Sequence, residues 1–103
     1  IAMLVDQKMN DGVEAPFFGR PAMTPVAAAQ LARRFDCPII LTTMYRPIGV
    51  NFVQQVETPF FVAQTGNREH DTLNAVTEIN ARLERFIRAH PGQWLWLHRR
   101  WPD

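Results

Sequence analysis

The 103-residue sequence contains one cysteine, Cys37, so no disulfide can form within the chain. Its apolar runs are much shorter than the ~20 residues that a membrane-spanning helix needs, and no signal peptide is visible. Charged residues make up 20% of the chain and the net charge is +1, so overall charge does not favour a nucleic acid partner. These absences leave a small globular domain in a reducing compartment as the expected class.

Hydrophobic residues make up 47% of the chain, which suits a folded domain rather than a disordered segment. A chain of this length supports one small domain. Ile1 already lies within an apolar run, and no initiator methionine precedes it. We therefore expect residues 1–103 to be a fragment of a longer protein.

The first half of the chain has the pattern of a strand–helix–strand unit. "IAMLV" at 1–5 is a continuous apolar run, typical of a strand buried on both faces. "TPVAAAQLARRF" at 24–35 predicts a helix with Thr24 as N-cap and Pro25 at the first helical position. "IILTTMY" at 39–45 predicts a second strand. Because such a crossover makes its two strands parallel, the expected fold class is α/β with a βαβ unit.

The second half adds a third strand and C-terminal helices. "RPIG" at 46–49 is a turn signal, and "VNFVQQVE" at 50–57 predicts a strand antiparallel to the second. Apolar residues recur at three- and four-residue steps over 72–89, which predicts a long helix with Asp71 as its N-cap. A short final helix is expected over 92–100.

Polar groups follow both strands of the predicted βαβ unit. Asp6 and Gln7 come after the first strand, and Arg46 follows the second. Parallel strands end at the same edge of a sheet, where open α/β sheets bind ligands. Asp6 and Gln7 suit the orientation of a hydroxyl or amine, or else the support of a neighbouring loop. Arg46 suits a phosphate or carboxylate, or else is a solvated turn residue.

The loop over 6–23 is longer than most connections, which favours a functional loop. It contains an aromatic pair before a glycine: Phe17, Phe18 and Gly19. This pair either lines an acyl-chain groove, dips into lipid headgroups, or seals the loop onto the core. His70 lies beside two acids, but the sequence has no zinc spacing and no glycine-rich phosphate loop, so no metal site is expected.

The tail "QWLWLHRRWPD" at 93–103 is rich in tryptophan and arginine. If it is helical, one face packs on the sheet while Arg99 and Arg100 point toward solvent, lipid headgroups or a phosphorylated ligand. His98 and Asp103 have the His-x4-Asp spacing of an acyltransferase motif. Because Pro102 breaks the helix between them, we interpret that spacing as a coincidence.

The chain as a whole resembles a known family. "DQK…DGVEAPFFGRPAMTPVAAAQLARRF…PIILTTMYR" and "NARLERFIRAHPGQWLWLHRRW" are similar to the C-terminal part of the bacterial lipid A biosynthesis acyltransferases. The most specific pieces are "DQ" with "FFG" and "TP", and "PGQWLWLHRRW". The resemblance implies that residues 1–103 are the C-terminal part of a single acyltransferase domain with the glycerolipid-acyltransferase-like α/β fold.

The resemblance also implies an activity. Such enzymes move a fatty acyl group from acyl carrier protein to a hydroxyl of a phosphorylated lipid A precursor, at the cytoplasmic face of the cell inner membrane. Their catalytic His-x4-Asp/Glu motif would precede Ile1, so the isolated segment is expected to be inactive. No metal or organic cofactor is implied.

By the same resemblance, the segment keeps part of the substrate-binding wall. Its expected residues are Asp6, Gln7, Phe17, Phe18, Gly19, Thr24 and Arg46, with Arg46, Arg99 and Arg100 facing phosphates. An exposed strand edge recruits further pairing, so the segment is expected to dimerise.

Two other hypotheses are open from the residues alone. One is a non-enzymatic module that binds lipid or nucleic acid through the tryptophan- and arginine-rich tail. Nucleic acid is disfavoured, because the overall charge is nearly balanced and the tryptophans lie on a buried-looking helix. The other is an intact small enzyme that uses His98 and Asp103.

Overall fold

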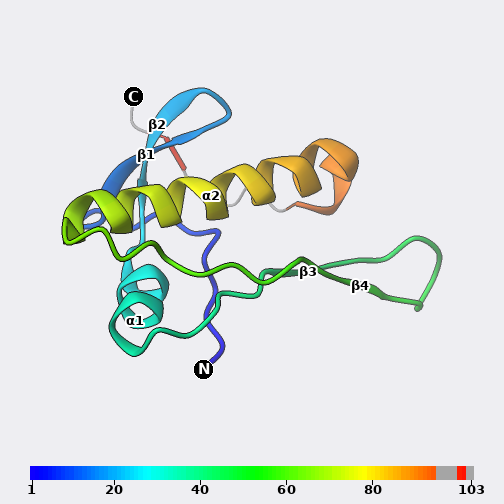
Figure 1. Ribbon diagram of the computed structural model, residues 1–103. Coiled ribbons are helices and arrows are strands. Elements are labelled where there is room, and N and C mark those ends of the chain that lie inside the picture. Colours follow the sequence, from blue (N-terminus) through cyan, green and yellow to red (C-terminus); the bar gives the residue numbers. More distant parts are fainter. Residues whose placement is uncertain (95–99, 102–103) are drawn as a thin grey trace.

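The computed structural model describes residues 1–94, 100 and 101. Two two-stranded antiparallel sheets and two α-helices make up this part of the chain (Figure 1). The elements are β1 (Val13–Phe17), β2 (Arg20–Thr24), α1 (Ala27–Phe35), β3 (Thr42–Tyr45), β4 (Val53–Val56), α2 (Arg68–Ala89) and the short 3-10 helix η1 (Pro91–Gln93). The mixed α/β class is therefore confirmed. The predicted βαβ unit is wrong within the described residues, because β3 pairs only with β4.

Residues 1–5 do not form the predicted first strand. Ile1 and Leu4 are exposed, and only Val5 packs against the core. An apolar run predicts burial, but a strand also needs a neighbouring strand to satisfy its backbone hydrogen bonds. The described residues offer no such neighbour to this segment.

The predicted loop 6–23 contains the β1–β2 hairpin instead. Its two-residue turn has positive φ at both Phe18 (53°) and Gly19 (74°), as a type I′ turn requires. Pro16 lies directly opposite Pro21. Phe17 and Arg20 flank the turn. The pair that flanks a two-residue hairpin turn is hydrogen-bonded, so the next pair out is a non-hydrogen-bonded one. Two prolines fit there because no ladder N–H is required of them.

Helix α1 begins later than predicted. Thr24 is the last residue of β2, and Val26 occupies the N-cap position without a side-chain cap. The helix ends as predicted before Pro38, with Asp36 in the left-handed region at φ 49° and Cys37 N–H donating to Ala32 O at 3.1 Å. The buried alanines Ala29 and Ala32 let α1 pack closely on α2.

The β3–β4 hairpin is confirmed as antiparallel, although both strands are shorter than predicted. All four residues of β4 are exposed. The hairpin extends away from the helices as an arm (Figure 1). An isolated bridge between Ile39 and Phe60 and a hydrogen bond from Glu57 N to Leu41 O at 2.9 Å join the chain before and after the arm.

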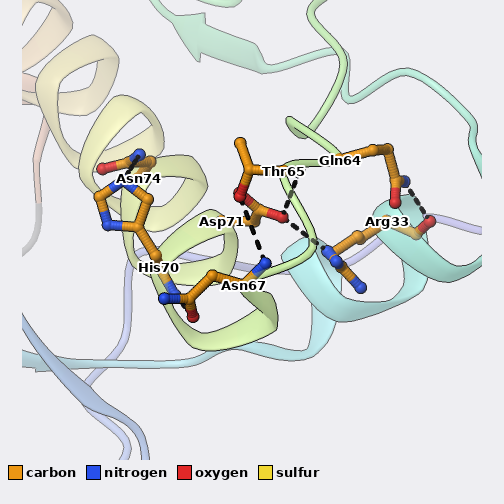
Figure 2. Close-up of polar contacts among 7 residues, drawn as sticks. All are labelled: Arg33, Gln64, Thr65, Asn67, His70, Asp71 and Asn74. Atoms are coloured by element: carbon orange, nitrogen blue, oxygen red, sulfur yellow. Dashed lines mark hydrogen bonds and ion pairs between the residues drawn. The ribbon is translucent and has the colours of Figure 1, made fainter.

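Helix α2 begins at Arg68 rather than at residue 72. Its N-cap is Asn67, whose side chain accepts a hydrogen bond from His70 N at 3.1 Å. Asp71 is therefore not the cap but a buried carboxylate. It accepts hydrogen bonds from Thr65 Oγ1 (2.6 Å), Thr65 N (3.0 Å) and Arg33 Nε (3.1 Å) (Figure 2). This cluster ties α1 and the loop before α2 to the first turn of α2.

The predicted apolar face of α2 is largely confirmed. Its buried apolar members are Ala75, Val76, Ile79, Leu83 and Ile87. Leu73, one of the apolar residues in the predicted helix over 72–89, is instead exposed. One core cluster lies where α2 meets α1 and β1, and a second lies where α2 meets the β1–β2 hairpin, Trp94 and Trp101.

The chain after α2 forms η1 over Pro91–Gln93 in place of the start of the predicted helix 92–100. Residues 95–99, including His98 and Arg99, lie outside the described residues, as do Pro102 and Asp103. No helix in the described part is both long enough and apolar enough to cross a membrane.

Candidate functional site

A buried polar centre lies between β2, α2 and the segment at Arg100. Thr24 Oγ1 accepts hydrogen bonds from Asn80 Nδ2 at 3.1 Å and from Arg100 Nη2 at 3.2 Å. It donates to Ala22 O at 3.0 Å. Thr24 thus links three segments that are distant in sequence, and we call Thr24, Asn80 and Arg100 the hairpin centre.

Arg100 is only 1% exposed. Its Nη1 donates to Met23 O at 2.8 Å, and its guanidinium lies 5.0 Å from the centroid of the Phe17 ring. Burial lowers the pKa of the Arg100 guanidinium from its usual value, and the nearby negative charge of Asp6 partly offsets this by raising the pKa. The expectation that Arg100 points toward solvent is therefore wrong, whereas its contact with a phosphorylated ligand stays a prediction.

Aromatic side chains enclose the hairpin centre. Phe17 is buried, stacks on Trp101 at a centroid distance of 5.4 Å, and meets Trp94 edge-on at 5.8 Å. Trp101 Nε1 donates to Phe17 O at 2.9 Å. Phe17 thus seals the hairpin onto the core. Phe18 in the turn is half-buried, and the Arg88 guanidinium lies 4.8 Å from its ring centroid.

Asp6 and Arg46 lie beside consecutive residues of one segment. Trp94 Nε1 donates to Asp6 Oδ2 at 3.4 Å. The Gln93 side chain bonds the backbone N and O of Arg46, each at 3.1 Å. Asp6 and Arg46 are therefore held near each other by their contacts with Trp94 and Gln93. They do not meet at the ends of parallel strands, as the sequence predicted.

The other predicted residues are dispersed. Gln7 and Gly19 are exposed. The Arg46 side chain is exposed and lies over the Phe52 ring at 5.9 Å, on the β3–β4 arm. Arg99 lies outside the described residues. The structure thus brings Asp6, Phe17, Thr24 and Arg100 together and leaves the rest at the periphery.

Sequence reasoning missed two polar residues of α2. Asn80 is fully buried and donates to Pro16 O at 3.2 Å as well as to Thr24. Glu84 accepts a hydrogen bond from Phe18 N–H in the hairpin turn. The signal for Asn80 was available, because a polar residue next to Ile79 interrupts the apolar stripe of the helix. Glu84 had no comparable signal, since glutamate is common on exposed helix faces.

A large apolar groove of about 800 Å³ lies beside the hairpin centre. Residues 1–6, α1, residues 37–44 and α2 contribute its walls. Asp6, Gln93 and Trp94 also line it and add polar atoms. Its volume falls in the range of ligand sites, roughly 300–1,000 Å³. A mostly apolar lining with a few polar groups at one place suits a long hydrocarbon chain that ends in a polar group.

His70 is exposed and pairs with Asn74 Nδ2 at 3.1 Å (Figure 2). Among the described residues, no group of three His, Cys, Asp or Glu side chains is placed to hold a metal ion.

Comparison with known proteins gave one match. The family model described as bacterial lipid A biosynthesis acyltransferase matches residues 1–103, the whole of the chain. No match was found among curated proteins or among solved structures.

Proposed function

Since the chain belongs to the bacterial lipid A biosynthesis acyltransferase family, we propose that it is the C-terminal part of an acyltransferase domain. The enzyme moves a fatty acyl group from acyl carrier protein to a hydroxyl of a phosphorylated lipid A precursor. It works at the cytoplasmic face of the inner membrane. The observation that carries this proposal is the family match over the full length of the chain. The apolar groove supports it, because an acyl chain needs such a surface.

In this proposal the groove holds the acyl chain. Each buried CH2 contributes about 0.8 kcal/mol of binding, so a long chain gains most of its affinity from apolar walls. Leu31, Leu83 and Phe86 are among the residues that supply those walls. Asp6, Gln93 and Trp94 would then lie near the polar end of the acyl group.

The acceptor hydroxyl needs a general base to attack the acyl carbonyl. In the proposed scheme the base is the histidine of a His-x4-Asp/Glu motif outside residues 1–103, and the acid of that motif orients it. His98 and Asp103 are not assigned this role. The isolated chain is therefore expected to show no turnover with acyl carrier protein and the acceptor lipid, and measurable turnover would contradict this assignment.

A bulky side chain in the groove tests the acyl site in the longer enzyme. Ala28 lines the groove, so Ala28→Phe should shorten the space open to the chain. We expect kcat/KM to fall roughly tenfold or more for long acyl donors and much less for short ones, since each lost CH2 contact costs about 0.8 kcal/mol.

The matched control is Ala63→Phe, because Ala63 is exposed and does not line the groove. This variant should keep the wild-type dependence on chain length. An equal loss across all chain lengths in Ala28→Phe, or no loss, would contradict the placement of the acyl chain. If the wild-type enzyme transfers no acyl group to any acceptor lipid tested, the proposed reaction itself would be contradicted.

A further inference from the structure

A second cavity, of about 570 Å³, lies between α1 and the first turns of α2. Three of its lining residues are arginines: Arg33 and Arg34 from α1 and Arg68 from α2. The small residues Ala29, Ala32 and Ala75 pack where the two helices meet, which brings these arginines together. The acyl-transfer proposal makes no use of this cavity.

The cavity carries an excess of positive charge. Arg33 Nε bonds Asp71, but the two terminal nitrogens of Arg33 make no hydrogen bond to the other residues drawn in Figure 2. Arg34 and Arg68 are exposed, and neither pairs with a carboxylate in the described part of the chain. Asp71 opposes only one of the three charges, and its oxygens are already bonded to Thr65 and Arg33.

A buried hydroxyl gives an independent indication of a ligand. Thr72 lines the cavity, is only 5% exposed, and its Oγ1 has no hydrogen-bond partner among the described residues. A buried polar group without a partner is unfavourable, so such groups are usually satisfied by water or by a ligand. Thr72 follows Arg68 by one helical turn of α2, so both residues lie on the same side of the helix.

From these observations we propose that the cavity binds the phosphate group of a phosphomonoester. Guanidinium groups donate paired hydrogen bonds to phosphate oxygens, and the Thr72 hydroxyl adds a further donor. Glu69, the other acid in this first turn, does not line the cavity. The site is separate from the proposed acyl groove apart from the shared residue Leu31, and it does not depend on acyl transfer.

Titration of the 103-residue chain with inorganic phosphate tests the site, by calorimetry and by ³¹P NMR. The double variant Arg34→Gln/Arg68→Gln should bind phosphate roughly tenfold or more weakly, because it loses two charge-assisted interactions. The matched control Arg85→Gln/Arg88→Gln removes the same charge from the far end of α2, and its affinity should stay near wild type. Equal weakening in both double variants, or none in the first, would overturn the proposal.

Thr72→Val separates a binding role from a packing role. Valine keeps the shape of threonine and removes the unpartnered hydroxyl, so the variant should fold at least as stably as wild type while phosphate binding weakens several-fold. Unchanged phosphate affinity in a folded Thr72→Val variant would overturn the role of this residue and with it the proposal.

Vesicles identify the source of the phosphate. If vesicles containing phosphatidic acid bind the chain more tightly than phosphatidylcholine vesicles, and free phosphate competes, the source is a lipid headgroup. If only free phosphate binds, the source is a soluble phosphate compound. Binding of a carboxylate-rich peptide through Arg34 and Arg68, with no response to phosphate, would overturn the proposal in favour of an acidic protein partner.

Discussion

Single residues decide how the hairpin centre is built. Thr24 has the sequence context of a helix N-cap, because Pro25 and a run of alanines follow it. In the structure its hydroxyl serves Asn80 and Arg100 instead, and the helix starts without a side-chain cap. Sequence patterns weigh local partners, whereas both of these partners lie more than fifty residues away. The sequence allowed Phe17 to be predicted as a residue that seals the hairpin onto the core. It gave no signal that the Arg100 side chain points into the protein.

The buried carboxylate of Asp71 makes the free energy of unfolding depend on pH in acid solution. The hydrogen bond from the Thr65 hydroxyl is the largest influence and lowers the pKa of Asp71, burial opposes it by raising the pKa, and Thr65 N–H and Arg33 lower it further. Because the folded pKa lies below the usual value of 3.8, the ionised carboxylate stabilises the fold above that value. This stabilisation is lost as the pH falls from about 4 through the folded pKa.

Asp71→Asn should therefore be clearly less stable than wild type at about pH 6, and the difference should shrink in more acid solution. Urea denaturation at a series of pH values measures it. Asp11→Asn, at an exposed carboxylate, is the matched control and should show little change. A difference between wild type and Asp71→Asn that stays constant from about pH 6 to pH 2 would contradict this linkage.

At the scale of elements, the sequence predicts the long helix and the hairpin with a clear turn signal, but it does not predict the strand pairing of the N-terminal part. Helix α2 follows from its apolar spacing, and the β3–β4 hairpin follows from the turn at 46–49. The β1–β2 hairpin was missed because Pro16 and Pro21 argue against strands unless their pairing is known. The prediction of a strand at 1–5 is wrong because an apolar run does not reveal whether a partner strand exists.

The β1–β2 turn should be sensitive to any side chain at Gly19. An added Cβ would meet no atom within 4 Å there, so the cost comes only from the backbone at φ +74°. Gly19→Ala should destabilise the protein by about 1 kcal/mol. Gly92 is the matched control, because it too has open space but no positive φ. Equal thermal unfolding midpoints for Gly19→Ala and Gly92→Ala would contradict this explanation.

At the scale of the whole molecule, the β3–β4 arm leaves apolar side chains exposed. The exposed residues on and beside it include Met44, Ile48, Val50, Phe52, Val53 and Val56. Both edges of this two-stranded sheet lack a further strand among the described residues. Exposed edges and contiguous apolar patches favour association with other chains.

The isolated chain should therefore form dimers or larger species through this arm. Sedimentation velocity over a range of concentrations measures the association. Ile48→Lys/Val56→Lys should shift the chain toward monomer, because it places one charge in the exposed loop of the arm and one on the edge strand β4, and such charges oppose association. Leu73→Lys, at an exposed apolar residue of α2 and outside the arm, is the control and should leave the association unchanged. A monomer at high concentration in the wild-type chain would contradict this prediction.

The hairpin centre also constrains how the protein is made. The Thr24–Arg100 hydrogen bond joins residues that are 76 positions apart, whereas the β1–β2 turn joins close neighbours. During synthesis on the ribosome the hairpin emerges long before Arg100 and Trp101. Until they arrive, Phe17 and Thr24 lack the partners that cover them. The nascent chain must therefore keep this apolar hairpin without its C-terminal cover while the residues between Thr24 and Arg100 are made, which makes this step a natural point for chaperone assistance.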